Sequence, residues 1–168
     1  MTTSSQGQAI SFPGVPLSSR IAFVIFLLLA LTAMALTMRL EVPAVVWVLR
    51  VVITAGAVAF AIYLAKRDLG GQATDIDRTA FDRWTIVHTS AGVVFGLFGI
   101  PFLLVAILTV AWEAFEILAP GFGETEVLIN RAVDILVAWA GWLVVAGVIA
   151  LATSTGLPFL PAPDSVLG

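Results

Sequence analysis

The longest apolar stretch of the sequence covers residues 84–118. As one helix, its roughly 35 residues would be about 52 Å long, whereas the hydrocarbon core of a bilayer is about 30 Å thick. The triplet Gly99-Ile100-Pro101 interrupts the stretch, and proline both ends a helix and disfavours helix at the residue before it. The sequence therefore predicts two short membrane helices, 84–98 and 101–119, joined by a tight hairpin. The first is short enough that a re-entrant helix is an alternative to a full span.

Three further apolar stretches predict helices at about 21–38, 43–65 and 131–154, and Pro43 suits the first turn of the second of these. Charged residues make up 11% of the chain, against about a quarter in soluble domains, and the mean hydropathy is +1.08. The composition excludes an ordinary soluble domain. It predicts an all-α integral membrane bundle of about five transmembrane helices, forming one domain over residues 20–155.

The two ends of the chain differ from this apolar centre. Residues 1–19 are rich in Ser, Thr, Gly and Pro, and predict a flexible cytoplasmic tail. They carry no positive side chain, so the first helix is expected to stay uncleaved rather than to act as a signal peptide. Residues 156–168 contain three prolines and predict an extended C-terminal tail. Cysteine is absent, which excludes disulfides, iron–sulfur clusters and thiolate zinc sites. No basic run indicates a nucleic-acid partner.

Basic residues indicate how such a bundle would be oriented. Five spans place most of them on one side of the membrane: Arg20, Lys66, Arg67, Arg78, Arg83 and Arg131. The positive-inside rule makes this side cytoplasmic. We therefore expect a multi-pass protein of the cell (inner/plasma) membrane, surrounded by lipid, with its N-terminus in the cytoplasm and its C-terminus outside. Arg50 lies about 10 Å inside the second helix, so it is expected to snorkel outward or to pair with Glu41, with lipid or substrate contact as the alternative.

Four ionisable residues are predicted to share one depth of the bundle. His88, the only histidine, lies about 6 Å inside the third helix. Glu113 and Glu116 lie within about 8 Å of the end of the fourth helix, and Asp134 lies about 5 Å past the start of the fifth. All three helix ends face the cytoplasm in the predicted topology. Ionisable groups are costly in hydrocarbon, so this shared depth marks a candidate functional site.

The faces of the three helices give a second and independent argument. His88 shares a stripe with Gly92 and Gly96, a spacing that allows close approach of another helix. Asp134 shares a stripe of the fifth helix with Gly141. Glu113 and Glu116 are i,i+3 neighbours on one face of the fourth helix. Because each polar group lies on the small-residue stripe of its helix, we expect the four to meet inside the bundle.

The chemistry of this cluster is open at the level of sequence. As a metal site, it would use His88, Glu113 and Glu116 as ligands of a divalent ion such as Mn²⁺, Fe²⁺ or Zn²⁺, with Asp134 orienting them. The supporting residues would then be Asp82, Arg83, Asn130 and Arg131. The same four ionisable groups could instead perform acid/base catalysis, relay protons, or form a structural network with arginines. Three tryptophans are expected to be packing residues: Trp112, Trp139 and Trp142.

Several short motifs resemble a known group of membrane proteins. They are Asp82-Arg83-Trp84 followed by His88 and Gly92, then Trp112-Glu113-x-x-Glu116, and then Asn130-Arg131-x-x-Asp134 followed by Gly141. Over about residues 81–147, they resemble the DUF2238-like (YjdF-type) proteins and, more distantly, the VanZ-like family. This resemblance implies a bundle of four to six membrane helices and supports His88, Glu113, Glu116 and Asp134 as one unit. It implies no reaction.

These observations lead to hypotheses of different classes. In the first, the cluster binds a metal or performs acid/base chemistry on a lipid or lipid-linked substrate, with the four ionisable residues as catalytic groups. In the second, the protein is a non-catalytic accessory or scaffold subunit that docks to protein partners in the membrane through its small-residue faces. In the third, the cluster transfers protons.

Overall fold

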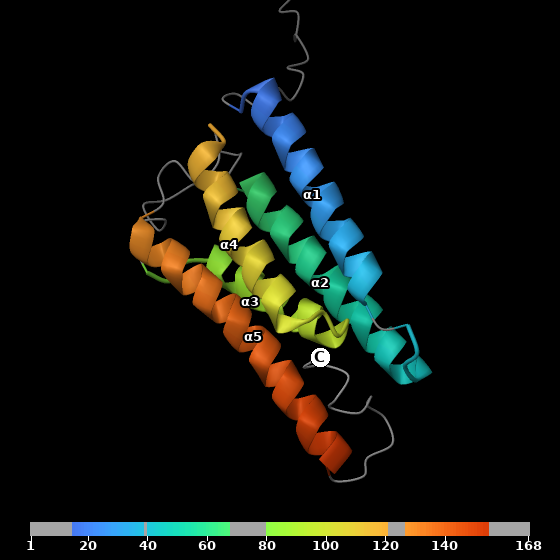
Figure 1. The fold of residues 1–168 in the computed structure, drawn as a ribbon. Helices are drawn as coiled ribbons and strands as arrows, with labels where there is room; N and C mark the ends of the chain where they lie inside the picture. The colour runs from blue at the N-terminus through green and yellow to red at the C-terminus, as the bar shows by residue number, and fades with distance from the viewer. Residues whose placement is uncertain (1–14, 39, 68–79, 121–126, 155–168) are drawn as a thin grey trace, which may run out of the picture.

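The computed structural model describes residues 15–38, 40–67, 80–120 and 127–154. Within these ranges the chain forms five α-helices and no strand, which confirms the predicted all-α fold (Figure 1). The helices are α1 (Leu17–Thr37), α2 (Ala44–Arg67), α3 (Trp84–Leu97), α4 (Phe102–Leu118) and α5 (Leu128–Ser154). The first begins inside the segment predicted to be a tail. Residues 1–14 of the predicted N-terminal tail and the whole predicted C-terminal tail lie outside the described residues.

Three of the helices are long and apolar enough to cross a membrane, namely α1, α2 and α5. The other two are shorter, with 14 residues in α3 and 17 in α4. At helical rise they are about 21 Å and 26 Å long, less than the hydrocarbon core of roughly 30 Å.

The hairpin between α3 and α4 is closed by glycine at the point that the sequence predicts. Gly99 has a φ of 70°, and its N–H donates to the Gly96 carbonyl at 2.9 Å. The Ile100 N–H donates to the Phe95 carbonyl at 3.0 Å. This pair of bonds is the Schellman arrangement, which needs a left-handed residue after the helix. Pro101 then precedes α4 with a φ of −58°, which suits the start of a helix.

Helices α3 and α5 pack very closely, and small residues allow it. A Cβ atom added to Gly92 would collide with the carbonyl oxygen of Ala138, and one added to Gly141 would lie 2.5 Å from the carbonyl oxygen of Thr89. A Cβ atom on Gly96 would lie 2.8 Å from the Cβ of Val145. The glycines that the sequence pattern singles out therefore form the contact between α3 and α5, where two backbones touch.

The apolar core lies beyond this contact, around the hairpin. Its buried members are Ile100, Val105, Trp142, Val145 and Ile149. The indole N–H of Trp142 donates to the Ile100 carbonyl at 2.8 Å, which ties the hairpin to α5. Helix α1 joins this bundle through a separate group of aromatic rings. Phe23 and Phe26 of α1 contact Trp112 and Phe115 of α4, with ring centroids 5.6 to 6.3 Å apart.

Arg50 also holds the hairpin, contrary to the expectation that it snorkels outward. The residue is 1% exposed, and its Nε donates to the Leu97 carbonyl at 2.8 Å. The guanidinium carbon lies 4.8 Å from the centre of the Trp47 ring and 4.9 Å from that of Phe98. The carbonyl at the end of α3 accepts this hydrogen bond and the two rings attract a cation, and these contacts hold the guanidinium inside the bundle.

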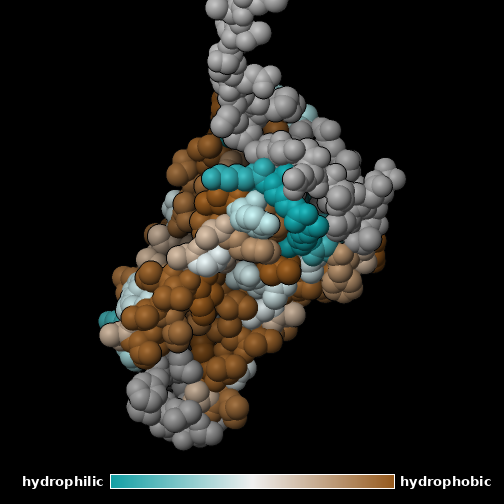
Figure 2. Space-filling model, turned by 180° about the vertical axis from the view of Figure 1, so that it is seen from behind, coloured by the Kyte–Doolittle hydropathy of each residue, from teal (hydrophilic) through white to brown (hydrophobic). Residues whose placement is uncertain are grey.

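Most of the remaining surface is apolar. Figure 2 shows brown, hydrophobic side chains over most of the face opposite to that of Figure 1, while most hydrophilic residues gather near the end from which α1 starts. Exposed leucines are frequent on α1, for example Leu28, Leu29 and Leu36. A surface of this kind suits contact with lipid chains rather than water. The fold is that of a membrane protein with its polar surface concentrated at one end.

Candidate functional site

The start of α3 is fixed by a cap, which sets the position of His88 one turn later. The Asp82 carboxylate accepts the Thr85 backbone N–H at 2.9 Å, and the Thr85 hydroxyl accepts the Asp82 backbone N–H at 3.1 Å. This reciprocal pair satisfies two backbone donors at the helix start. Asp82, predicted as a supporting residue of the cluster, thus acts in the structure as the cap of α3.

Three helices bring His88, Glu113 and Asp134 together. Each of these residues offers one ligand atom, and the three atoms all lie within 4.8 Å of one another. The Nε2 of His88 lies 3.6 Å from the Oδ2 of Asp134. Glu113 is 5% exposed and Asp134 is 0% exposed, whereas the His88 side chain keeps 15%. The two carboxylates are therefore buried, while part of the His88 side chain reaches the surface of the bundle.

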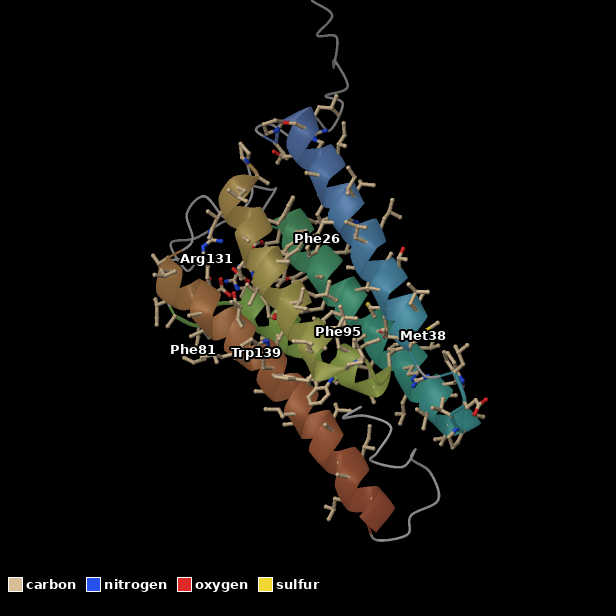
Figure 3. The ribbon with its side chains drawn as sticks, viewed as in Figure 1. Phe26, Met38, Phe81, Phe95, Arg131 and Trp139 are labelled. Carbon is tan, nitrogen blue, oxygen red and sulfur yellow. The ribbon has the colours of Figure 1, made fainter. Side chains whose placement is uncertain are left out.

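Arg131 supplies a positive charge to this cluster. Its Nη1 lies 3.7 Å from the Oε2 of Glu113 and donates to the Glu113 carbonyl at 3.4 Å. Figure 3 shows Arg131 near the beginning of α5, beside a group of nitrogen and oxygen atoms between α4 and α5. Both members of the ion pair are buried, with side chains 9% and 7% exposed. A buried cation that pairs with one of two carboxylates keeps the net charge of the cluster low.

Asn130 lies next to Arg131 and one helical turn before Asp134. Its side chain is 0% exposed. Neither the Nδ2 nor the Oδ1 of its amide has a hydrogen-bond partner within the described part of the chain. A buried amide without partners costs about 1–3 kcal/mol. The fold thus places an unsatisfied polar group beside the cluster.

Glu116 and Arg83, both predicted to belong to the site, lie outside the group formed by His88, Glu113 and Asp134. Glu116, predicted as a ligand, is not a member of the group of three, and Asp134, predicted to orient the ligands, takes its place. The reason is geometric, because an i+3 position is displaced by about 4.5 Å along the helix and rotated by about 60° from Glu113. Arg83 precedes α3, and it forms no ion pair with Glu113 or Asp134 among the described residues.

A hydrogen bond between α4 and α5 fixes how these two helices are aligned, and with them Glu113 and Asp134. The indole N–H of Trp139 donates to the Thr109 hydroxyl at 2.9 Å, and this hydroxyl donates to the Val105 carbonyl at 3.0 Å. Thr109 lies one turn before Glu113, and Trp139 lies five residues after Asp134. Trp139 therefore packs between the helices and also holds them in place, which its hydrophobic character alone does not indicate.

The spacing of the three ligand atoms, all within 4.8 Å of one another, is somewhat wider than that of a closed metal site. Ligand atoms around one ion with bonds of about 2.1 Å lie about 3 to 4 Å apart, so small side-chain rotations suffice to close the group around an ion. One imidazole nitrogen and two carboxylate oxygens suit Mn²⁺, Fe²⁺ or Zn²⁺. Arg131 pairs with Glu113, and Asp134 faces His88.

In the comparisons with known proteins, no family model matched the chain, and no curated protein or solved structure was found similar to it. The resemblance to the DUF2238-like and VanZ-like families therefore stays a prediction.

Proposed function

We propose that this protein is a divalent-cation-binding membrane protein, with a metal centre formed by His88 of α3, Glu113 of α4 and Asp134 of α5. The observation that carries the proposal is the convergence of three ligand atoms within 4.8 Å from three different helices. Two buried carboxylates next to an imidazole form a costly arrangement in an apolar bundle, and a divalent cation would offset that cost. The metal would also join three helices at one point.

Elemental analysis of the purified protein tests this proposal directly. The wild type and a His88→Ala variant are purified in detergent, freed of any polyhistidine tag, and measured for Mn, Fe and Zn. We expect close to one metal per chain in the wild type and a large loss in the variant, because the imidazole is the only nitrogen ligand of the group. Equal metal contents in folded samples of both proteins would overturn the proposal.

A catalytic role is a second candidate, because the His88 side chain is 15% exposed whereas the carboxylates are buried. An ion there would be reachable from one side and could act as a Lewis acid. His88 lies about 6 Å along α3 from the start of the helix. If α3 starts at the membrane surface, this places His88 near the boundary between the headgroup layer and the hydrocarbon core. We therefore propose a lipid or lipid-linked substrate. Metal-dependent conversion of a membrane lipid extract by the wild type, absent in His88→Ala, would support catalysis. Identical lipid profiles with and without metal would exclude it for the lipids tested.

The scaffold hypothesis gains less support. It relied on small-residue faces that would dock a partner, but Gly92, Gly96 and Gly141 pack against neighbouring helices within the chain itself. These faces are therefore not available to another protein in this fold. Gly56 and Gly147 have open space at their Cβ positions, which matches lipid contact as well as a protein contact.

The orientation in the membrane is also part of the proposal. We place the beginnings of α1, α3 and α5 and the end of α2 on the cytoplasmic side of the cell membrane, because Lys66, Arg67 and Arg83 lie there. The chain lacks cysteine, so single cysteines can be introduced as labels at two exposed residues. In the proposed orientation Lys66 lies on the cytoplasmic side of the membrane and Leu40 on the outer side. An impermeant maleimide applied to intact cells should label Leu40→Cys and spare Lys66→Cys. The reverse pattern would invert the topology.

A further inference from the structure

The buried amide of Asn130 has no partner within the described residues, yet it lies beside the proposed metal centre. Asn130 and Asp134 are separated by four residues of α5, so they share one face of the helix, with Cβ atoms about 6 Å apart. Both side chains are 0% exposed, which directs them to the same interior region of the bundle. Folded proteins leave few buried polar groups unsatisfied, so an amide in this position indicates a ligand.

We propose that the Oδ1 of Asn130 is a fourth protein ligand of the centre formed by His88, Glu113 and Asp134. This inference rests on the proposed function, since it assigns a further ligand to the same site. An amide oxygen is a neutral, hard donor of the kind that binds oxygen-preferring cations. The complete donor set is then one nitrogen and three oxygens. Such a set favours Mn²⁺ or Fe²⁺ over the softer, thiolate-seeking ions.

The first part of α5 then supplies two metal ligands and one cation within five residues. Asn130 and Asp134 face the ion, while Arg131 between them pairs with Glu113 across the helix contact. A neutral fourth ligand suits this site, because it adds no further buried charge to the two carboxylates, the divalent ion and Arg131.

Asn130 should affect the metal-free and the metal-bound protein in opposite ways. Without metal, its unsatisfied amide destabilises the fold, whereas with metal its oxygen contributes to binding. Asn130→Leu, which keeps a similar volume, should therefore leave the metal-free melting temperature unchanged or raise it. The same variant should weaken Mn²⁺ binding by about tenfold or more, as measured by titration of free Mn²⁺ by electron paramagnetic resonance. Thr54→Val is the matched control, because Thr54 lies on α2, outside the three helices that form the centre, and its buried hydroxyl also has no hydrogen-bond partner among the described residues; this variant should leave the affinity unchanged.

The wild-type protein offers a test that needs no mutation. Asn130 is the only asparagine in the sequence, so asparagine labelled with ¹³C at Cγ marks a single site. If Oδ1 binds the metal, Cγ lies about 3 Å from Mn²⁺, and electron–nuclear double resonance should show a strong ¹³C coupling. Absence of that coupling, or an unchanged Mn²⁺ affinity in Asn130→Leu, would overturn the assignment of Asn130 and leave the three-ligand centre standing. Equal Mn²⁺ binding by wild type and His88→Ala would instead overturn the proposed function.

Discussion

The Nε2 of His88 lies 3.6 Å from the Oδ2 of Asp134, one helical turn before the place where Gly92 meets the backbone of Ala138. Both pairs keep the same offset along the chain, because α3 and α5 run in the same direction. The distance between the two ionisable groups is thus set by the glycine contact between the helices. The packing of α3 on α5 and the geometry of the candidate site are therefore one structural feature.

Gly92→Ala should disrupt both packing and site. The new methyl group would collide with the Ala138 carbonyl, which belongs to the backbone and cannot rotate away, so α3 and α5 must separate. We expect a loss of about 1–3 kcal/mol of unfolding free energy in detergent and weaker metal binding. Gly147→Ala is the control, because its Cβ position is open and alanine favours helix by up to about 1 kcal/mol. Equal stability of the two variants would contradict the close contact.

Arg131→Gln should expose the cost of the buried Glu113 carboxylate. Removing one member of a buried ion pair typically costs about 3–5 kcal/mol, because the remaining charge loses its compensation. Thermal unfolding of metal-free protein should show this loss, and saturating Mn²⁺ should reduce it, since the ion can replace the guanidinium. The double variant Arg131→Gln/Glu113→Gln should be more stable than Arg131→Gln alone. If the double variant is the less stable one, the ion pair does not contribute as described.

Arg50→Lys tests the role of the arginine at the end of α3. Lysine keeps the charge, but it lacks the planar guanidinium that reaches the Leu97 carbonyl and lies over Trp47 and Phe98. We expect a loss of about 2 kcal/mol in chemical unfolding, the size of a hydrogen bond to a charged group. Wild-type stability for this variant would mean that the positive charge alone matters at this position.

Trp142→Phe should cost more than Trp112→Phe. In the first variant the buried Ile100 carbonyl loses the indole donor that lies 2.8 Å away, which costs about 1–3 kcal/mol. In the second no such bond is lost, because the Trp112 Nε1 is buried without a hydrogen-bond partner in the described part of the chain. The difference between the two melting temperatures isolates the bond that ties the hairpin to α5. Equal losses in both variants would assign the effect to ring volume alone.

Much of this architecture follows from local sequence. Gly99 and Pro101 mark the hairpin because a left-handed residue and a missing N–H act on the backbone at their own positions. The glycine spacing on α3 predicts a helix contact for a similar reason, since absent side chains leave room whatever the partner is. The bounds of the helices differ from the predicted ones by a few residues, as expected where apolar sequence continues past a helix end.

The details of the site depended on tertiary contacts. Depth and helix face placed His88, Glu113 and Asp134 together, but they did not show that Asp134 rather than Glu116 completes the group of three, because that depends on how α4 is rotated against its neighbours. The inward direction of Arg50 was likewise not predictable, since its partner is a carbonyl at the end of another helix. Asn130 is predicted from the sequence as a supporting residue, but its complete burial and its lack of a hydrogen-bond partner among the described residues depend on the packing of α5.

Pulsed electron paramagnetic resonance of Mn²⁺ bound to tag-free protein tests the central claim most directly. The chain contains one histidine, so any imidazole nitrogen coupled to the ion must belong to His88. We expect the Mn²⁺ signal of the wild type to show modulation by a single imidazole nitrogen, and we expect His88→Gln to lose this modulation. A spectrum of bound Mn²⁺ without imidazole modulation, or one that is identical in the wild type and the variant, would contradict a metal centre at His88, Glu113 and Asp134.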